Sequence, residues 1–130
     1  GSYATQWAEI RDWVATQPSI QALVISGDRH ALYADDGSGG APGTTYWPNV
    51  GGAPFHQGSS AACETWTHGY YAGTPGATLK AFGWLDIHDN GAAITIDYSG
   101  ITALDGLTQV SMSITFPAST SLPARWGIHI

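Results

Sequence analysis

The stretch Ile20-Gln21-Ala22-Leu23-Val24-Ile25-Ser26-Gly27-Asp28-Arg29-His30 decides the fold, because a short apolar run ends there abruptly at polar residues. The run 20–25 is rich in branched side chains, which predicts a strand that is buried on both faces within a parallel or mixed sheet. Ser26-Gly27 ends this strand. Since open α/β sheets place their sites at the carboxyl ends of strands, residues 28–30 are the first candidates for chemistry.

A helix is predicted immediately before that strand. Tyr3, Trp7, Ile10 and Val14 recur at intervals of three and four residues, which places them on one helical face. Pro18 ends the helix, because proline lacks the N–H of a helical residue and keeps the residue before it out of the α region. A helix followed closely by a buried strand is half of an α/β unit.

The rest of the chain divides into a long loop region, a β meander and a tail. Residues 35–77 are rich in Gly, Pro, Ser and Thr and show no period, so we expect a long ordered loop region that its many aromatic side chains hold in place. Apolar and polar residues alternate in 94–98 and 110–116, and with 79–88 these runs predict a three-strand antiparallel meander. Asn90-Gly91 is a strong hairpin signal. The tail 118–130 shows no period.

These elements predict an α/β or α+β fold in a single domain, 1–130, with the helix and buried strand first and the meander last. Apolar residues make up 43% and charged residues 11% of the chain, a composition that argues against disorder. The net charge is -6 and the four basic residues are scattered, which excludes a nucleic-acid partner bound through a basic stripe. No apolar run approaches about 18 residues, so no membrane span is expected. Cys63 is alone and excludes an intramolecular disulfide.

Asp28 and His30 are the strongest candidates for a metal site. We expect Gly27 to let the chain turn sharply as it leaves the strand, so that both side chains reach a common position above the sheet. Carboxylate oxygen and imidazole nitrogen suit Zn, Mn or Fe ions, which polarise a phosphoryl oxygen and lower the pKa of bound water. The alternative is that Asp28 caps a turn and His30 is an ordinary surface residue.

A family resemblance covers the same residues. The segments 6–11 (Gln-Trp-Ala-Glu-Ile-Arg) and 23–30 (Leu-Val-Ile-Ser-Gly-Asp-Arg-His) resemble the helix, strand and last metal-binding motif of PhoD-like (alkaline phosphatase D-type) enzymes. These belong to the calcineurin-like metallophosphoesterases. The resemblance runs from about Tyr3 to Tyr33 and continues loosely to Phe116, so it is to the C-terminal part of such an enzyme. It implies a layered α/β/β/α sandwich with metals at the strand ends, and a secreted or periplasmic location.

The resemblance also implies an activity and roles for residues. Asp28 and His30 would ligate a dinuclear centre of Zn, Mn or Fe, with Ca a further option. The substrates would be small phosphate monoesters or diesters, hydrolysed by a metal-activated water. Arg29 lies where it could contact the phosphate, with a plain salt bridge as the alternative. Because a catalytic metal site needs about three protein ligands and an open position, His56 and His68 are further candidate ligands. The alternative for His68, which the sequence favours, is a satisfied core histidine.

Each further candidate to complete the site also has a structural alternative. These candidates are His88, Asp35, Asp36, Glu64, Asp86 and Asp89. Asp35-Asp36 before Gly37 predicts a solvated turn. Asp86 and His88 alternate with apolar residues, which predicts that they lie on the exposed face of a strand. Asp89 belongs to the expected hairpin turn.

A metal-dependent phosphoester hydrolase is therefore the leading hypothesis, in a truncated or self-assembling form. A truncated sheet exposes a strand margin and apolar surface, which predicts a homodimer or larger assembly whose second copy supplies missing parts of the site. Two alternatives remain open. The six Trp and six Tyr residues would suit a non-catalytic carbohydrate-binding module, because aromatic faces stack on sugars. The chain could also be a fragment without activity of its own.

Overall fold

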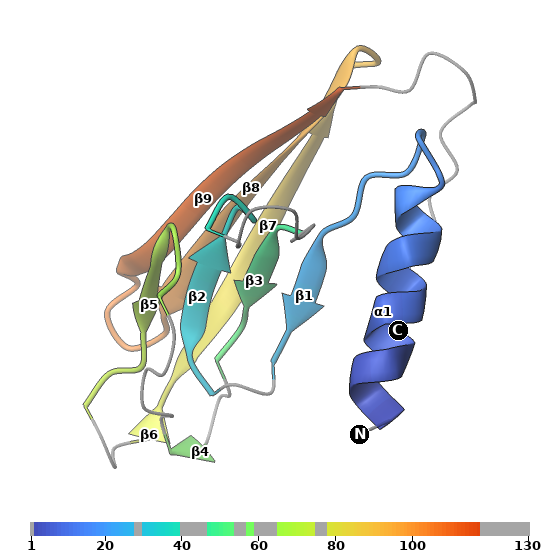
Figure 1. Ribbon diagram of the computed structural model, residues 1–130. Helices are drawn as coiled ribbons and strands as arrows, with labels where there is room; N and C mark the ends of the chain where they lie inside the picture. The colour runs from blue at the N-terminus through green and yellow to red at the C-terminus, as the bar shows by residue number, and fades with distance from the viewer. Residues whose placement is uncertain are drawn as a thin grey trace.

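The computed structural model describes residues 2–27, 30–39, 47–53, 57–58, 65–74 and 78–117, without the side chains of 2–4, 57, 58 and 78. Within these residues the chain forms one helix and nine strands (Figure 1). In order they are α1 (Ser2–Ala15), β1 (Val24–Ser26), β2 (Leu32–Asp35), β3 (Asn49–Gly51), β4 (Gln57–Gly58), β5 (Gly69–Tyr71), β6 (Thr78–Leu79), β7 (Ala81–Asp89), β8 (Ala93–Thr102) and β9 (Thr108–Pro117).

The strands form three sheets. A four-stranded mixed sheet has the order β1-β3-β2-β5, β4 pairs with β6, and β7-β8-β9 form a three-stranded antiparallel sheet. The described fold is therefore mostly β with one helix, which is compatible with a small α+β domain. No helix in these parts of the chain is long and apolar enough to span a membrane.

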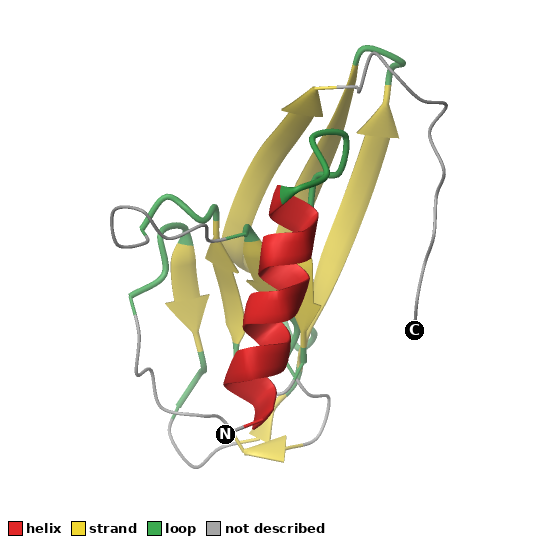
Figure 2. Ribbon diagram, turned by 45° about the vertical axis from the view of Figure 1, so that its right-hand side comes forward, coloured by secondary structure: helices red, strands yellow, loops and turns green. Residues whose placement is uncertain are grey.

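The predicted N-terminal helix is confirmed. It ends at Ala15, three residues before Pro18, and the N–H of Thr16 donates to the Trp13 carbonyl in a tighter turn (3.0 Å). Figure 2 shows the helix in front of the sheets. The ring centroids of Trp7 and Trp47 lie 5.0 Å apart in an edge-to-face arrangement. On the predicted apolar face Ile10 is more than half exposed, whereas Trp7 and Val14 are partly covered, so the described residues cover this face only in part.

The strand predicted at residues 20–25 is shorter and less buried than expected. β1 begins at Val24, because Ile20 belongs to a turn in which its N–H donates to the Gln17 carbonyl (3.0 Å). Ile25 is 64% exposed, so the prediction of burial on both faces is wrong. The reason is position, since β1 lies at the margin of its sheet and pairs with β3 alone among the described strands. Its parallel pairing and its end at Ser26 are as predicted.

The region 35–77 is not the continuous loop that its composition predicts. It contains β3, β4 and β5, and β2 ends at its first residue, Asp35. β2 occupies the middle of the mixed sheet, antiparallel to both β3 and β5. These strands have two to four residues each, too few for an alternating pattern to stand out in the sequence.

The C-terminal meander is confirmed. Tyr98 of β8 lies opposite Leu85 of β7 and Met112 of β9, so all three face the same side of the sheet. The first predicted strand is interrupted at Lys80, where β6 ends and β7 begins. In the predicted hairpin turn Gly91 has a φ of 79°, while the side chain of Asn90 accepts hydrogen bonds from the two N–H groups that follow Gly91.

The core lies where the mixed sheet packs on the half of the meander that contains the start of β7, the later part of β8 and the start of β9. Figure 1 shows the two sheets crossing there, with the meander extending beyond the mixed sheet. The core side chains come from both sheets: Leu32, Ala34, Val50, Ala53, Leu79, Ala81, Tyr98, Val110 and Met112. The core thus fixes the position of β2 and β3 in the mixed sheet.

Candidate functional site

The mixed sheet has two ends with different chemistry. At one end β1 and β3 finish side by side, because they are parallel and Ser26 is in register with Gly51. The N–H of Gly52 donates to the Ser26 carbonyl (2.9 Å) and joins the two strand ends. β2 begins at this end, which lies at the bottom of Figure 1. We call it the His30 end, since His30 comes two residues before β2.

His30 has a strained backbone. Its φ is 54°, and it is the only non-glycine residue with a positive φ in the described part of the chain. The left-handed conformation costs an L-residue roughly 1–2 kcal/mol. Histidine occurs there more often than most residues, and such strain gathers at functional sites. The His30 side chain is half-buried, and the next residue, Ala31, is fully buried.

Three other predicted site residues lie outside the described residues. Asp28 and Arg29 connect Gly27, directly after β1, to His30. His56 follows β3 by five residues and precedes β4. In sequence, three of the four predicted ligands (Asp28, His30 and His56) follow the ends of the adjacent parallel strands β1 and β3.

The turn after β1 is not explained by a special backbone at Gly27. Gly27 is absent from the residues with positive φ, and a β-carbon there would meet nothing within 4 Å. The prediction that Gly27 is needed for a sharp turn is therefore not supported. Among the described residues of this turn, the left-handed residue is His30.

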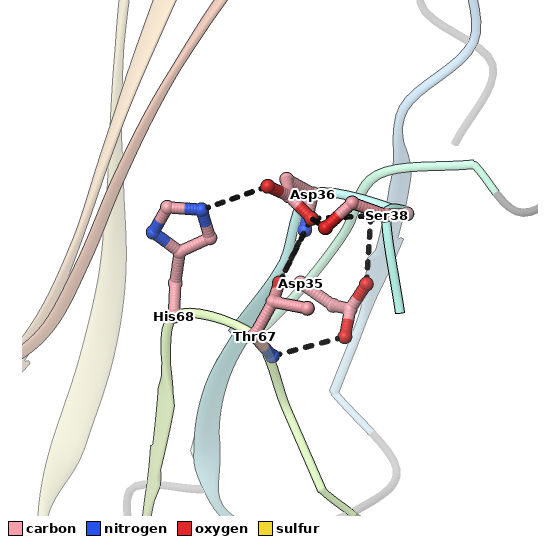
Figure 3. Close-up of polar contacts among 6 residues, drawn as sticks. Asp35, Asp36, Ser38, Thr67 and His68 are labelled. Carbon is pink, nitrogen blue, oxygen red and sulfur yellow. Dashed lines mark hydrogen bonds and ion pairs between the residues drawn. The ribbon is translucent and has the colours of Figure 1, made fainter. Parts of the chain in front are cut away.

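The opposite end of the mixed sheet holds a network of polar side chains, shown in Figure 3. We call it the Asp36 end. One carboxylate oxygen of Asp36 accepts hydrogen bonds from the N–H (2.9 Å) and hydroxyl (2.6 Å) of Ser38 and from the Thr67 hydroxyl (3.0 Å). The other lies 3.2 Å from Nε2 of His68. These bonds, those from Ser38 above all, hold the pKa of Asp36 well below its usual range.

Asp35 completes this network. Its Oδ1 accepts from the N–H of Gly37 (2.7 Å) and its Oδ2 from the N–H of Thr67 (3.1 Å). The predicted turn at Asp35-Asp36 is confirmed, and it also ties the end of β2 to the segment before β5. Each carboxylate is occupied by hydrogen bonds from these two segments.

His68 lies at the Asp36 end, away from His30. Its N–H donates to the carbonyl of Ala34 (3.0 Å), near the end of β2, whereas His30 precedes the start of that strand. The four residues of β2 span roughly 13 Å, while a metal ion lies only about 2 Å from a ligating nitrogen. The structure therefore does not bring His68 and His30 to one ion. His68 is also not a core histidine, since 36% of its side chain is exposed.

A third acid–histidine group lies on the outer face of the meander, as predicted for Asp86 and His88. Nε2 of His88 lies 3.3 Å from Asp86 and 4.0 Å from Asp97, and about half of each side chain is exposed. Ion pairs this exposed contribute at most about 1 kcal/mol. Across the described ranges, no three or more His, Cys, Asp or Glu side chains are placed to hold a metal ion together.

Sequence reasoning missed the residues that support the His30 end. A β-carbon at Gly51 would lie 2.0 Å from the ring of Tyr33, and the Tyr98 hydroxyl donates to the Gly51 carbonyl (2.6 Å). The pair Gly51-Gly52 was the available signal, because adjacent glycines allow close approach of other groups to the backbone.

Comparison with models of protein families, with curated proteins and with solved structures finds no significant match to this chain. The geometry of the His30 end and the motif that contains His30 are therefore the features that bear on function.

Proposed function

We propose that the chain belongs to a metal-dependent hydrolase of phosphate monoesters or diesters, with Asp28 and His30 as metal ligands at the His30 end. The observation that carries this proposal is the left-handed backbone of His30 beside the carboxyl ends of β1 and β3. Two sheets packed face to face are compatible with part of an α/β/β/α sandwich of the PhoD-like kind. The same likeness is the reason to propose a secreted or periplasmic location.

The donor atoms of this end suit a transition metal. Asp28 offers a carboxylate, and His30 and His56 offer imidazoles. Imidazole nitrogen favours Zn, Mn or Fe over Ca, which prefers a shell of oxygen ligands. When bound, such an ion polarises a phosphoryl oxygen and supplies a nucleophile near neutral pH.

The remaining task of the protein is to bind and orient an anionic substrate. The chain carries a net charge of -6, which by itself repels a phosphate ester. A bound cation reverses the local charge. Arg29, between the two ligands in sequence, can add a pair of parallel hydrogen bonds to phosphate oxygens, which its planar guanidinium suits.

Self-association is part of the proposal, as a route to any further ligands. Ile10, Trp13 and Ile25 are each more than half exposed and come from α1 and the margin strand β1. Surface of this kind is typical of protein interfaces. Sedimentation or native mass spectrometry at micromolar concentration should show a homodimer or larger species, and a monomer alone would contradict it.

Metal content tests the site directly. We expect Asp28→Ala and His30→Ala to abolish the bound Zn, Mn or Fe that elemental analysis finds in the wild-type chain. His68→Ala and His88→Ala are matched controls, because each removes one imidazole from elsewhere in the fold and should leave metal content unchanged.

Activity provides the second measurement. Hydrolysis of p-nitrophenyl phosphate and of bis(p-nitrophenyl) phosphate should disappear on chelation and return with the metal. Hydrolysis indifferent to the chelator, or equal metal content in all four variants, would remove the basis of the proposal.

One observation favours a second candidate, carbohydrate binding. Trp84 is 60% exposed and lies two residues before Asp86, on the same outer face of β7. An exposed aromatic ring beside polar groups can stack on a sugar. On this alternative, Trp84→Ala lowers affinity for a polysaccharide, and chelators have no effect on binding.

A further inference from the structure

Tyr98 links the meander to the His30 end of the mixed sheet. It lies on β8, is only 2% exposed, and donates a hydrogen bond of 2.6 Å from its hydroxyl to the Gly51 carbonyl. Gly51 is the last residue of β3 and is in register with Ser26, the last residue of β1. A single side chain from one sheet therefore holds the strand ends of the other.

Glycines provide the space for the Tyr98 ring. A β-carbon at Gly83 would lie 2.9 Å from ring atom Cε2, and one at Gly100 would lie 3.0 Å from the hydroxyl oxygen. Gly83 and Gly100 are paired across β7 and β8. Because both lack a side chain, the ring lies over its own sheet with the hydroxyl directed at Gly51.

Gly51 is held from a second direction. The ring of Tyr33 occupies the position that a β-carbon of Gly51 would take, and Tyr33 is itself buried and stacked on Trp66 at 4.1 Å. Ring packing and a hydrogen bond to the carbonyl together fix this residue. Burial raises the pKa of Tyr98 far above its usual range, so the hydroxyl keeps the proton that it donates.

A shift of Gly51 would reach described residues on both sides of the proposed ligand Asp28 in the sequence. On one side, the N–H of Gly52 donates to the carbonyl of Ser26, which is two residues before Asp28. On the other side, Tyr33 packs on Gly51 and lies three residues after His30. Metal ligands must be held within about 0.5 Å of their productive geometry.

We propose that Tyr98 is a positioning residue for the end of β1 and for the proposed metal ligand His30. It acts through Gly51, through Tyr33 packed on Gly51, and through the hydrogen bond from Gly52 to Ser26. This inference rests on the proposed function. It assigns to a buried tyrosine of the meander, far from the motif in sequence, a part in setting metal affinity.

The test compares Tyr98→Phe, which keeps the ring and removes the hydroxyl, with Val110→Ala. Val110 is a core residue of β9 that is 3% exposed, so its truncation lowers stability and leaves the Tyr98 hydrogen bond in place. Titration with Co²⁺ should show visible absorption bands. We expect the Kd for Co²⁺ to rise about three- to tenfold in Tyr98→Phe, below the range for groups that bond a ligand directly, and less than about twofold in Val110→Ala.

Amide hydrogen exchange gives a readout without metal. Exchange of the Gly52 amide should accelerate in Tyr98→Phe more than in Val110→Ala, because only Tyr98→Phe removes the hydrogen bond to the Gly51 carbonyl. Unchanged exchange at Gly52, or unchanged Co²⁺ affinity in Tyr98→Phe, overturns the inference and leaves the proposed function standing. Equal weakening in both variants also overturns it, because stability alone then explains the loss. A wild-type chain that binds no Co²⁺ overturns the proposed function and the role of Tyr98 together.

Discussion

The two ends of the mixed sheet both have acidic residues and a histidine in their sequence, yet the structure treats them differently. At the Asp36 end, the carboxylates accept hydrogen bonds from the loop after β2 and the segment before β5, and His68 lies against Asp36. At the His30 end, the backbone is strained at His30, and Gly51 is fixed by two tyrosines. Residue type alone does not distinguish the two ends. Among the described residues, backbone strain marks the His30 end and hydrogen-bonded carboxylates mark the Asp36 end.

The largest expected effect comes from breaking the His30 end at Gly51. In Gly51→Ala the new β-carbon would lie 2.0 Å from the Tyr33 ring, so the buried ring or β3 must move. Overpacking of this severity destabilises by about 3 kcal/mol or more. Chemical denaturation should show the loss.

Gly27→Ala is the matched control for this variant. It adds the same methyl group beside the same turn, where nothing lies within 4 Å. Its free energy of unfolding should stay within about 0.5 kcal/mol of the wild-type value. Equal destabilisation by both substitutions would show that the fit around Gly51 is not what holds this end.

An intermediate effect is expected at His30, where the cost of the left-handed backbone can be measured separately from the loss of the imidazole. Both His30→Gly and His30→Ala remove the imidazole, but only glycine adopts a φ of 54° without steric cost. His30→Gly should therefore be more stable than His30→Ala by about 1 kcal/mol. Denaturant midpoints measure the difference, and a more stable alanine variant would contradict the left-handed assignment.

The smallest effect, expected at the Asp36 end, depends on pH. The folded-state pKa of Asp36 is lowered, so its stabilising contribution is present above the ordinary value of 3.8 and is lost as pH falls through the folded-state value. At pH 7 the free energy of unfolding of Asp36→Asn should be lower than that of the wild type, by less than the difference between His30→Gly and His30→Ala. The gap between Asp36→Asn and the wild type should narrow below about pH 4. Asp12→Asn, which changes an exposed helical carboxylate, is the control. A gap independent of pH would show that the charge of Asp36 is not involved.

The helix and the meander could be predicted because their patterns are local and long. Val110, Met112, Ile114 and Phe116 alternate over most of a ten-residue strand, and spacings of three and four recur through α1. The turn at Asp35-Asp36 was predictable for the same reason, since its bonds to Gly37 and Ser38 join residues two apart.

The mixed sheet could not be predicted in the same way. β2, β3 and β5 have three or four residues each, and their pairing joins segments far apart in the chain, as when Tyr33 lies opposite both Gly51 and Tyr70. The sequence predicted that His68 and His30 could share a metal site, but β2 separates the two residues. Nothing in the spacing of histidines along the chain records which end of a strand each one will occupy.

The sequence alone determined the elements whose signals fall within one turn or one strand: the helix, the meander, the end of β1 at Ser26 and the motif that follows it. Tertiary structure decided which strands lie side by side, that His30 rather than Gly27 takes the left-handed conformation, and that Tyr98 reaches Gly51. The physical reason is range. Periodicity and turn chemistry act between near neighbours, whereas burial, register and the space left by a missing β-carbon depend on residues that only the folded chain brings together.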